Sequence, residues 1–331
     1  MAIYKTEAIV LRSMEYSETS LIVWLLTRDH GRVDVIAKGA RRPRSPFEGA
    51  LEPLVRGELL FYRKARSEGL EVAKEFDPLD LHTGLRRDLP RLYRGLYLGE
   101  LATELSGQES PSPEAYDALR GGLAALAGDD SAWLDAALLS AELQLVAAAG
   151  LAPELDACTA CGAPVVPPTS TPGPQPGPGP RSAPEGPVAF SPAGVGVLCL
   201  EHGRRDGAAV RVSVAALRTL RALAAGQRLR VPRELGLELR EVLDRFVRHH
   251  LGKDLRLLRY LRTPAAAPEG PFARGRQDDG APPAPTRAGR SEPGSGRRPP
   301  APRAPAPLTG PQRAGPPRAT PPRATPIRKE A

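Results

Sequence analysis

Residues 19–47 read TSLIVWLLTRDHGRVDVIAKGARRPRSPF, and this stretch decides the fold of the first part of the chain. Apolar residues recur at every second position over 21–25 and again over 33–36, as expected of strands with one buried face. Asp29–Gly31, between these two runs, is typical of a tight hairpin turn. The stretch therefore predicts an antiparallel hairpin that leads into a loop rich in arginine.

Similar segments lie on both sides of this hairpin, and turn residues separate them. Five short strands in about 75 residues, without a substantial helix, favour a small closed barrel of the OB type over an open sandwich. An SH3-like barrel would give nearly the same pattern, and this alternative stays open. The five expected strands are Tyr4–Arg12, Thr19–Thr27, Arg32–Gly39, Leu54–Lys64 and Leu70–Phe76.

The loop after the third strand carries four cations within seven residues. Such a loop, interrupted by Gly and Pro, can follow a phosphate backbone without reading a sequence, although a loop of this kind can also be merely solvated. Phe47 lies beside it and is the preferred candidate for stacking on a base. The candidate DNA-binding residues are Lys38, Arg41, Arg42 and Arg44 in this loop, Phe47, and a second group at the next turn, Arg63, Lys64 and Arg66.

Beyond residue 80 the periodicity changes to that of helices, which makes the fold class α+β. The sequence predicts three domains: an OB-fold barrel over 1–80, a helical domain over 81–263, and a disordered Pro/Arg-rich tail over 264–331. A Pro-rich insertion over 164–187 interrupts the helical domain. The expected helices are Leu85–Ser106, Pro111–Ala127, Ala132–Ala149, Ser213–Ala225 and Arg233–Leu251.

The charge of the chain is unevenly distributed. The 331 residues carry a formal net charge of +8, but the tail alone accounts for +7 of it. Residues 81–203 carry −8 and residues 204–263 carry +9. The arginines of the latter segment either cover ordinary solvated faces or form a groove for an acidic partner. Arg218 and Arg221 are the candidate partner-binding residues.

The three cysteines of the chain and one histidine form two ligand pairs. Cys158 and Cys161 are separated by two residues, as are Cys199 and His202. This spacing is typical of a structural, four-coordinate zinc site of the Cys3His type. A pair of small buried cysteines or a redox pair is the alternative. The sequence predicts one structural zinc ion per chain.

Other features limit the function. A phosphate-cradling loop, a metalloprotease motif, a nucleophile elbow and a two-metal carboxylate cluster are all missing from the sequence, so we do not expect an enzyme. The amino-terminal residues lack an apolar signal region, and no apolar run approaches the length of a membrane span. With only three cysteines, the chain is expected in a reducing compartment, the cytoplasm.

Three stretches resemble the RecO family of bacterial recombination mediators. They are TEAIVLRSMEYSETSLIVWLLTRDHGRVDVIAKGARRPRSPFEGALEPL at 6–54, CTACG at 158–162 and FVRHHLGKDLRLLRYL at 246–261. The resemblance spans about residues 1–263, without the Pro-rich insertion and the tail. It implies an amino-terminal OB fold, a helical domain and an embedded zinc finger. One departure is visible: the usual fourth ligand is Cys, and here it is His202.

The resemblance also implies a function in DNA repair and homologous recombination, in the RecFOR pathway. Family members bind single- and double-stranded DNA, anneal complementary strands and help load RecA on coated single strands. The implied partners are RecR and the acidic C-terminal tail of the single-stranded-DNA-binding protein, with RecA reached indirectly. A nucleoid-associated, cytoplasmic location follows. The alternative is an RNA- or ribosome-associated OB/zinc-knuckle protein, since OB barrels bind RNA equally well.

Overall fold

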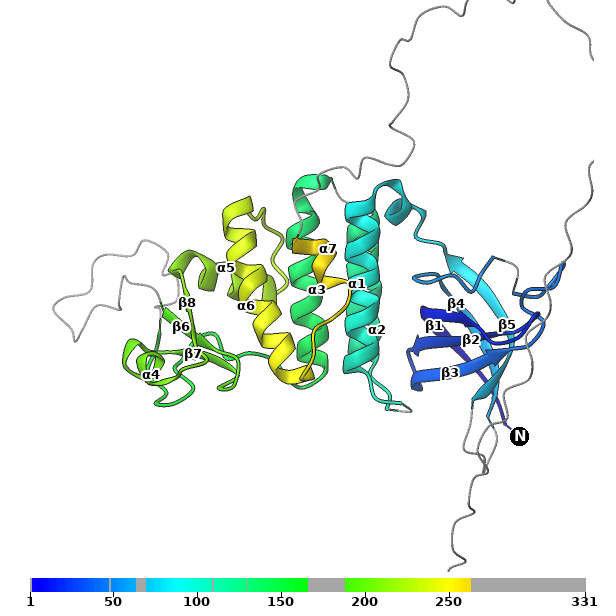
Figure 1. Ribbon diagram of the computed structural model, residues 1–331, viewed down its shortest axis with the longest axis horizontal. Helices are drawn as coiled ribbons and strands as arrows, with labels where there is room; N and C mark the ends of the chain where they lie inside the picture. Colours follow the sequence, from blue (N-terminus) through cyan, green and yellow to red (C-terminus); the bar gives the residue numbers. More distant parts are fainter. Residues whose placement is uncertain are drawn as a thin grey trace, which may run out of the picture. The chain divides into compact units, whose positions relative to one another are not determined.

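A computed structural model describes residues 2–47, 49–63, 70–108, 110–128, 130–165 and 188–262. The predicted tail and most of the Pro-rich insertion lie outside these residues. The first element is a closed five-stranded barrel with the strand order β1-β2-β3-β5-β4 (Figure 1). Its strands are β1 (Ala2–Glu15), β2 (Leu21–Thr27), β3 (Gly31–Ala37), β4 (Arg56–Arg63) and β5 (Glu71–Asp80).

The way in which the barrel closes identifies it as an OB fold. β1 pairs with β2 and β4 in antiparallel fashion, whereas β3 pairs with β5 in parallel. β1 can serve two neighbours because it is long and its register shifts between Val10 and Arg12, where a bulge bends the strand. The predicted hairpin is present, with Gly31 at a φ of 66°. A Cβ on Gly31 would also meet the carbonyl oxygen of Ser110 at 2.2 Å, so only glycine fits there.

The long helices lie close to the predicted ranges, and serine side chains cap two of them. The Ser112 hydroxyl accepts a hydrogen bond from the Ala115 N–H at 3.2 Å. The Ser213 hydroxyl accepts one from the Ala216 N–H at 3.1 Å, which caps the next helix in the same way. The long helices are α1 (Leu89–Leu105), α2 (Pro113–Gly128), α3 (Leu134–Ala148), α5 (Val214–Ala224) and α6 (Arg233–Leu251).

Short elements complete the described part of the chain. A three-stranded sheet with the order β7-β6-β8 lies between α3 and α5 in the sequence. The hairpin around Phe190 supplies two of its strands, β6 and β7, and the third strand, β8, pairs with β6. These elements are η1 (Thr83–Arg87), η2 (Ser131–Trp133), β6 (Val188–Ser191), β7 (Gly196–Leu198), α4 (Leu200–Arg205), β8 (Val210–Val212) and α7 (Leu258–Arg262).

The barrel and the helices share apolar and polar contacts. Leu11 and Leu54 of the barrel segment belong to the same buried cluster as the residues of α1 and α2. The Tyr116 hydroxyl of α2 donates a hydrogen bond to Glu7 of β1 at 2.9 Å, and Glu7 pairs with Arg56 at 3.1 Å. The hydrogen bond from Tyr116 and, to a smaller extent, the neighbouring Arg56 lower the pKa of the Glu7 carboxyl. The barrel is therefore fixed to the helices by a charged contact as well as by apolar packing.

Arg240 differs most from expectation. We expected it on a solvated helix face or in a groove, but it is only 8% exposed and lies in the core of the helical domain. Its guanidinium contacts Glu142 of α3 and lies 2.8 Å from Asp244. The Tyr97 hydroxyl of α1 donates to Glu142 at 2.8 Å. Because both carboxylates are buried, Arg240 serves as their counter-ion and is unavailable to a partner.

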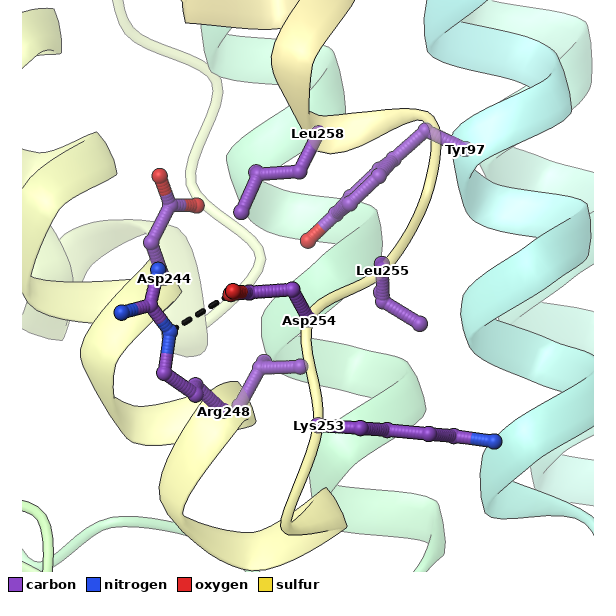
Figure 2. Close-up of a pocket in the computed structure, with 8 residues that line it drawn as sticks. Tyr97, Asp244, Arg248, Lys253, Asp254, Leu255 and Leu258 are labelled. Atoms are coloured by element: carbon purple, nitrogen blue, oxygen red, sulfur yellow. Dashed lines mark ion pairs between the residues drawn. The ribbon is translucent and has the colours of Figure 1, made fainter.

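The segment after α6 lies next to Tyr97 and Asp244 of this buried cluster. It runs between α6 and α1, and its residues and those of the two helices line a narrow indentation (Figure 2). Arg248 and Asp254 form an ion pair at 2.6 Å at the rim of this indentation. The lining residues are Tyr97, Asp244, Val247, Arg248, Lys253, Asp254, Leu255 and Leu258.

Candidate metal centre and nucleic-acid interface

The first cysteine pair lies on a tight turn. The Gly162 N–H donates to the Cys158 carbonyl at 2.7 Å, and the Cys158 N–H donates to the Ala163 carbonyl at 2.8 Å. Gly162 has a φ of 72°, a conformation that glycine adopts without strain. The turn brings Cys158 and Cys161 to the same side, where both sulfurs can reach one ion.

The second pair lies at the start of α4. Cys199 precedes the helix, and His202 lies in its first turn, with 3.1 Å between the Cys199 Sγ and the His202 Nδ1. The Thr159 N–H of the first turn donates to the Val197 carbonyl of β7 at 3.0 Å. The β6–β7 hairpin thereby brings the second pair to the first. The Pro-rich insertion that separates them in the sequence does not separate them in space.

The four side chains fit a tetrahedral zinc ion. Their ligand atoms all lie within 4.8 Å of one another, and 3.7 Å separates the Cys158 Sγ from the His202 Nδ1. Bonds of about 2.3 Å to tetrahedral zinc place sulfur ligands roughly 3.8 Å apart, which agrees with this cluster. Three thiolates and one imidazole are also ligands that zinc prefers. The predicted grouping is therefore confirmed, and it could hold a metal ion.

The electrostatics of Cys158 also suit a ligand. Burial raises the pKa of its thiol, but backbone N–H groups of Cys199, Ala160 and Cys161 outweigh this effect and lower the pKa to about 6. For Cys161 the Ala163 N–H lowers the pKa, but the sulfurs of Cys158 and Cys199 together with burial outweigh it, so the pKa is raised. The lowered pKa of Cys158 favours the thiolate, the form that binds metal.

The two candidate partner-binding arginines have different surroundings. Arg218 is exposed on α5. Arg221, one turn further along, hydrogen-bonds through Nε to the Leu155 carbonyl at 2.9 Å and pairs with Asp156 at the same distance. Its side chain is only 18% exposed. Arg221 therefore holds the segment that leads into Cys158, a contact the sequence did not reveal.

The basic loop has the exposure that the sequence predicted. Lys38, Arg41, Arg42 and Arg44 are all exposed. Consecutive turns shape the loop: the Arg42 N–H donates to the Gly39 carbonyl at 3.0 Å, and the Ser45 N–H to the Arg42 carbonyl at 3.1 Å. Arg41 pairs with Glu15 at 3.1 Å. Because both partners of this pair are exposed, it is weak and an anionic ligand can replace it.

The second basic group lies elsewhere. Arg63 pairs in register with Ala2, at the start of β1, whereas Arg41 of the basic loop contacts Glu15, at the end of the same strand. The two groups therefore flank opposite ends of β1. Arg63 packs over the rings of Tyr4 and Phe61 at 5.2 and 5.7 Å. Lys64 and Arg66 lie outside the described residues.

The interpretation of Phe47 is wrong. Its side chain is 3% exposed and belongs to the buried cluster of the barrel, so its ring cannot stack on a base. The Phe47 N–H donates to the Ser45 hydroxyl at 3.3 Å. Phe47 is therefore an anchor that ties the basic loop to the barrel core. Its position beside a polar loop gave no indication of this, because most members of its buried cluster lie on the barrel strands.

Comparisons with known proteins agree with this architecture. The family model "Recombination protein O N terminal" matches residues 1–81, and "Recombination protein O C terminal" matches residues 86–259. The chain belongs to the RecO family. The two matches meet near residue 80, close to the predicted end of the barrel domain.

Curated relatives from several bacteria carry the same family name. The DNA repair protein RecO of Myxococcus xanthus is 35% identical over 261 residues, which cover 78% of this chain and 96% of that protein. DNA repair protein RecO of Anaeromyxobacter dehalogenans strain 2CP-C is 36% identical over 270 residues, 78% of this chain and 95% of that protein. The one from Moorella thermoacetica is 30% identical over 259 residues, 77% of this chain and 88% of that protein.

The family places this chain in DNA repair and recombination. Among the described residues, no helix has the length and apolar character that crossing a membrane requires. The resemblance seen in the sequence and the family assignment thus agree.

Proposed function

We propose that this protein is a non-enzymatic mediator that binds single- and double-stranded DNA and anneals complementary strands. The observation that carries the proposal is the exposed basic loop of an OB barrel in a chain of the RecO family. Phosphates of the two strands would be neutralised at the same time by cations, which removes the repulsion that opposes pairing. Contacts of this kind read no sequence, as annealing of arbitrary strands requires.

The basic loop is the preferred contact surface on the barrel. Its four cations are Lys38, Arg41, Arg42 and Arg44, and the buried ring of Phe47 anchors the loop's far end. We also keep Arg63, Lys64 and Arg66 as a second group, at the opposite end of β1 from the loop.

The remaining parts have supporting tasks in this proposal. The partners would be RecR and the acidic C-terminal tail of the single-stranded-DNA-binding protein, and RecA would be loaded as a consequence. Since Arg221 is bonded to the metal-site segment, Arg218 is the better of the two candidates for an acidic peptide. One zinc ion held by Cys158, Cys161, Cys199 and His202 would stabilise the fold, because four protein ligands leave no position for a reacting water.

We also propose the predicted domain division: a DNA-binding barrel over 1–80, a helical domain over 81–263 with the zinc knuckle at 158–202 and the Pro-rich insertion at 164–187, and a disordered tail over 264–331. A nucleoid-associated location in the cytoplasm fits this function.

The test of the loop is a change of two arginines. Arg41→Ala with Arg42→Ala should weaken binding to single-stranded DNA and reduce the slope of log K against log salt by about 1.4, since each phosphate contact on a single strand contributes roughly 0.7. Filter binding at several salt concentrations measures both quantities. Annealing of coated complementary strands should slow in parallel. Unchanged affinity and slope would show that the loop does not contact DNA.

The RNA- or ribosome-associated alternative predicts a different preference. Competition between DNA and RNA oligonucleotides of the same sequence separates the two functions. A strong preference for RNA would contradict the repair function.

A further inference from the structure

A short segment between α5 and α6 places two arginines on one face. After the left-handed turn at Gly226, residues 227–232 form neither helix nor strand. Burial alternates along it: Arg228 and Arg230 are exposed, Leu229 packs against the core of the helical domain, and Val231 is 9% exposed. Alternation of this kind is typical of an extended chain. The two apolar side chains hold the segment against the core, so both arginines project from its opposite, exposed side.

Both arginines lie against one indole ring. The guanidinium carbon of Arg228 is 4.7 Å from the centroid of the Trp133 ring, and that of Arg230 is 5.3 Å from it. Trp133 is half-buried at the end of η2, where its backbone N–H donates a hydrogen bond to the Asp130 carbonyl at 2.9 Å. Cation–π contacts order the two guanidiniums before any ligand arrives, which lowers the entropic cost of binding.

The surroundings of Arg230 favour an external anion. Other arginines of the helical domain face carboxylates: Arg240 contacts Glu142, and Arg256 pairs with Glu100 at 3.2 Å. In the part of the chain that the structure describes, no carboxylate forms an ion pair with Arg230 within 4.0 Å. A guanidinium offers a planar set of N–H donors that matches phosphate, and two of them close together suit a ligand with repeated charges.

We propose that Trp133, Arg228 and Arg230 form a binding site for the phosphodiester backbone of a nucleic acid, on the helical domain and distinct from the basic loop of the barrel. This inference rests on the proposed function and extends it, because a protein that anneals strands benefits from more than one surface that neutralises phosphates. An acidic peptide is the competing ligand, since carboxylates also bind guanidiniums in pairs, and the experiment includes it.

The chain holds only two tryptophans, which gives a direct reporter. In a Trp24→Phe background, Trp133 is the sole indole, and oligo(dT) should quench its fluorescence when bound. Adding Arg228→Gln and Arg230→Gln should abolish the quenching, weaken DNA binding roughly tenfold at low salt, and reduce the salt slope by about 1.4. Arg211→Gln with Arg245→Gln removes the same charge from exposed positions of the same domain and serves as the matched control.

The outcomes are distinguishable. If the parent chain binds no oligonucleotide, both the proposed function and this inference are wrong. If it binds DNA but Trp133 is not quenched, and the double variant behaves like the control, only the inference is wrong. If a poly-glutamate peptide quenches Trp133 and oligo(dT) does not, the site takes an acidic protein segment, and the assignment to nucleic acid is overturned.

Discussion

The arginines of the barrel loop and those of the C-terminal helices have opposite surroundings. In the loop over 38–44 every cation is exposed, and the ion pair of Arg41 lies at the surface. In the helical domain, Arg240 is buried between two carboxylates and Arg221 is bonded to a main-chain carbonyl. Further along, Lys253 pairs with Glu104 at 2.7 Å and Arg256 with Glu100.

The difference shows that a local excess of charge is a poor guide to a free basic surface. Residues 204–263 carry +9, which suggested that their arginines could not be paired within the segment. Several of the cations pair instead with acidic residues of 81–203, which carry −8, because α6 and α7 pack against α1 and α3. Others, such as Arg245 and Arg248, pair with acidic residues of their own segment. The loop over 38–44 stays exposed because no acidic element packs on it among the described residues.

The largest effect is expected from Arg240. Arg240→Met should lower the free energy of unfolding by about 3–5 kcal/mol, since Glu142 and Asp244 would then be buried without their counter-ion. Urea unfolding measures the change. Arg240→Met combined with Glu142→Gln should recover part of the loss, because only one of the two buried carboxylates, Asp244, then lacks its counter-ion. A single variant as stable as the parent chain would show that Arg240 is not needed in the core.

The next effect separates Arg221 from Arg218. Arg221→Gln should lower the free energy of unfolding by about 1.5–3 kcal/mol, since hydrogen bonds from a charged group are lost. It should also speed the release of zinc to a chelator, and it should shift the visible spectrum of the cobalt-substituted protein if ligand geometry relaxes. Cys158→Ser removes one of the candidate ligands, so its rate of zinc release is the reference for the largest expected loss.

Arg218→Gln is the matched control on the same helix. Its stability should stay within about 0.5 kcal/mol of the parent chain, and its zinc should be released at the parental rate. Equal zinc release from the two variants would contradict the positioning role of Arg221.

A smaller effect tests Arg56, a barrel arginine that pairs with a carboxylate. Glu7, which pairs with Arg56 and Tyr116, has a lowered pKa, so it stabilises the fold above its unfolded value of 4.5, and this contribution is lost as pH falls through the lower folded pKa. The parent chain should therefore lose more stability between pH ~6 and ~3 than Glu7→Gln does. Urea midpoints across this range measure it, and parallel profiles would exclude the contribution.

The smallest effect is expected in the basic loop. Arg42→Ala should change the free energy of unfolding by less than about 0.5 kcal/mol, because the side chain is exposed. A clear loss of stability in thermal melts would mean that the loop arginines are structural, like those of the helices, and the contrast between the two regions would disappear.

Local patterns were enough to predict the elements. The alternation over 33–36, the Asp29–Gly31 turn and the caps at Ser112 and Ser213 each depend on neighbours within a few residues, and each is present. The helix over 233–251 has the predicted bounds. Spacing also predicted the metal cluster, because each ligand pair is set by its own turn.

The sequence by itself thus determined the barrel strands, the long helices and the grouping of the four candidate metal ligands, since all of these follow from short-range periodicity and turn chemistry. Only the tertiary structure decided the environment of individual side chains. It buried Phe47, surrounded Arg240 with Glu142 and Asp244, and gathered Arg228 and Arg230 over Trp133. Each of these outcomes depends on residues far apart in the chain, whose approach is fixed by the packing of whole elements.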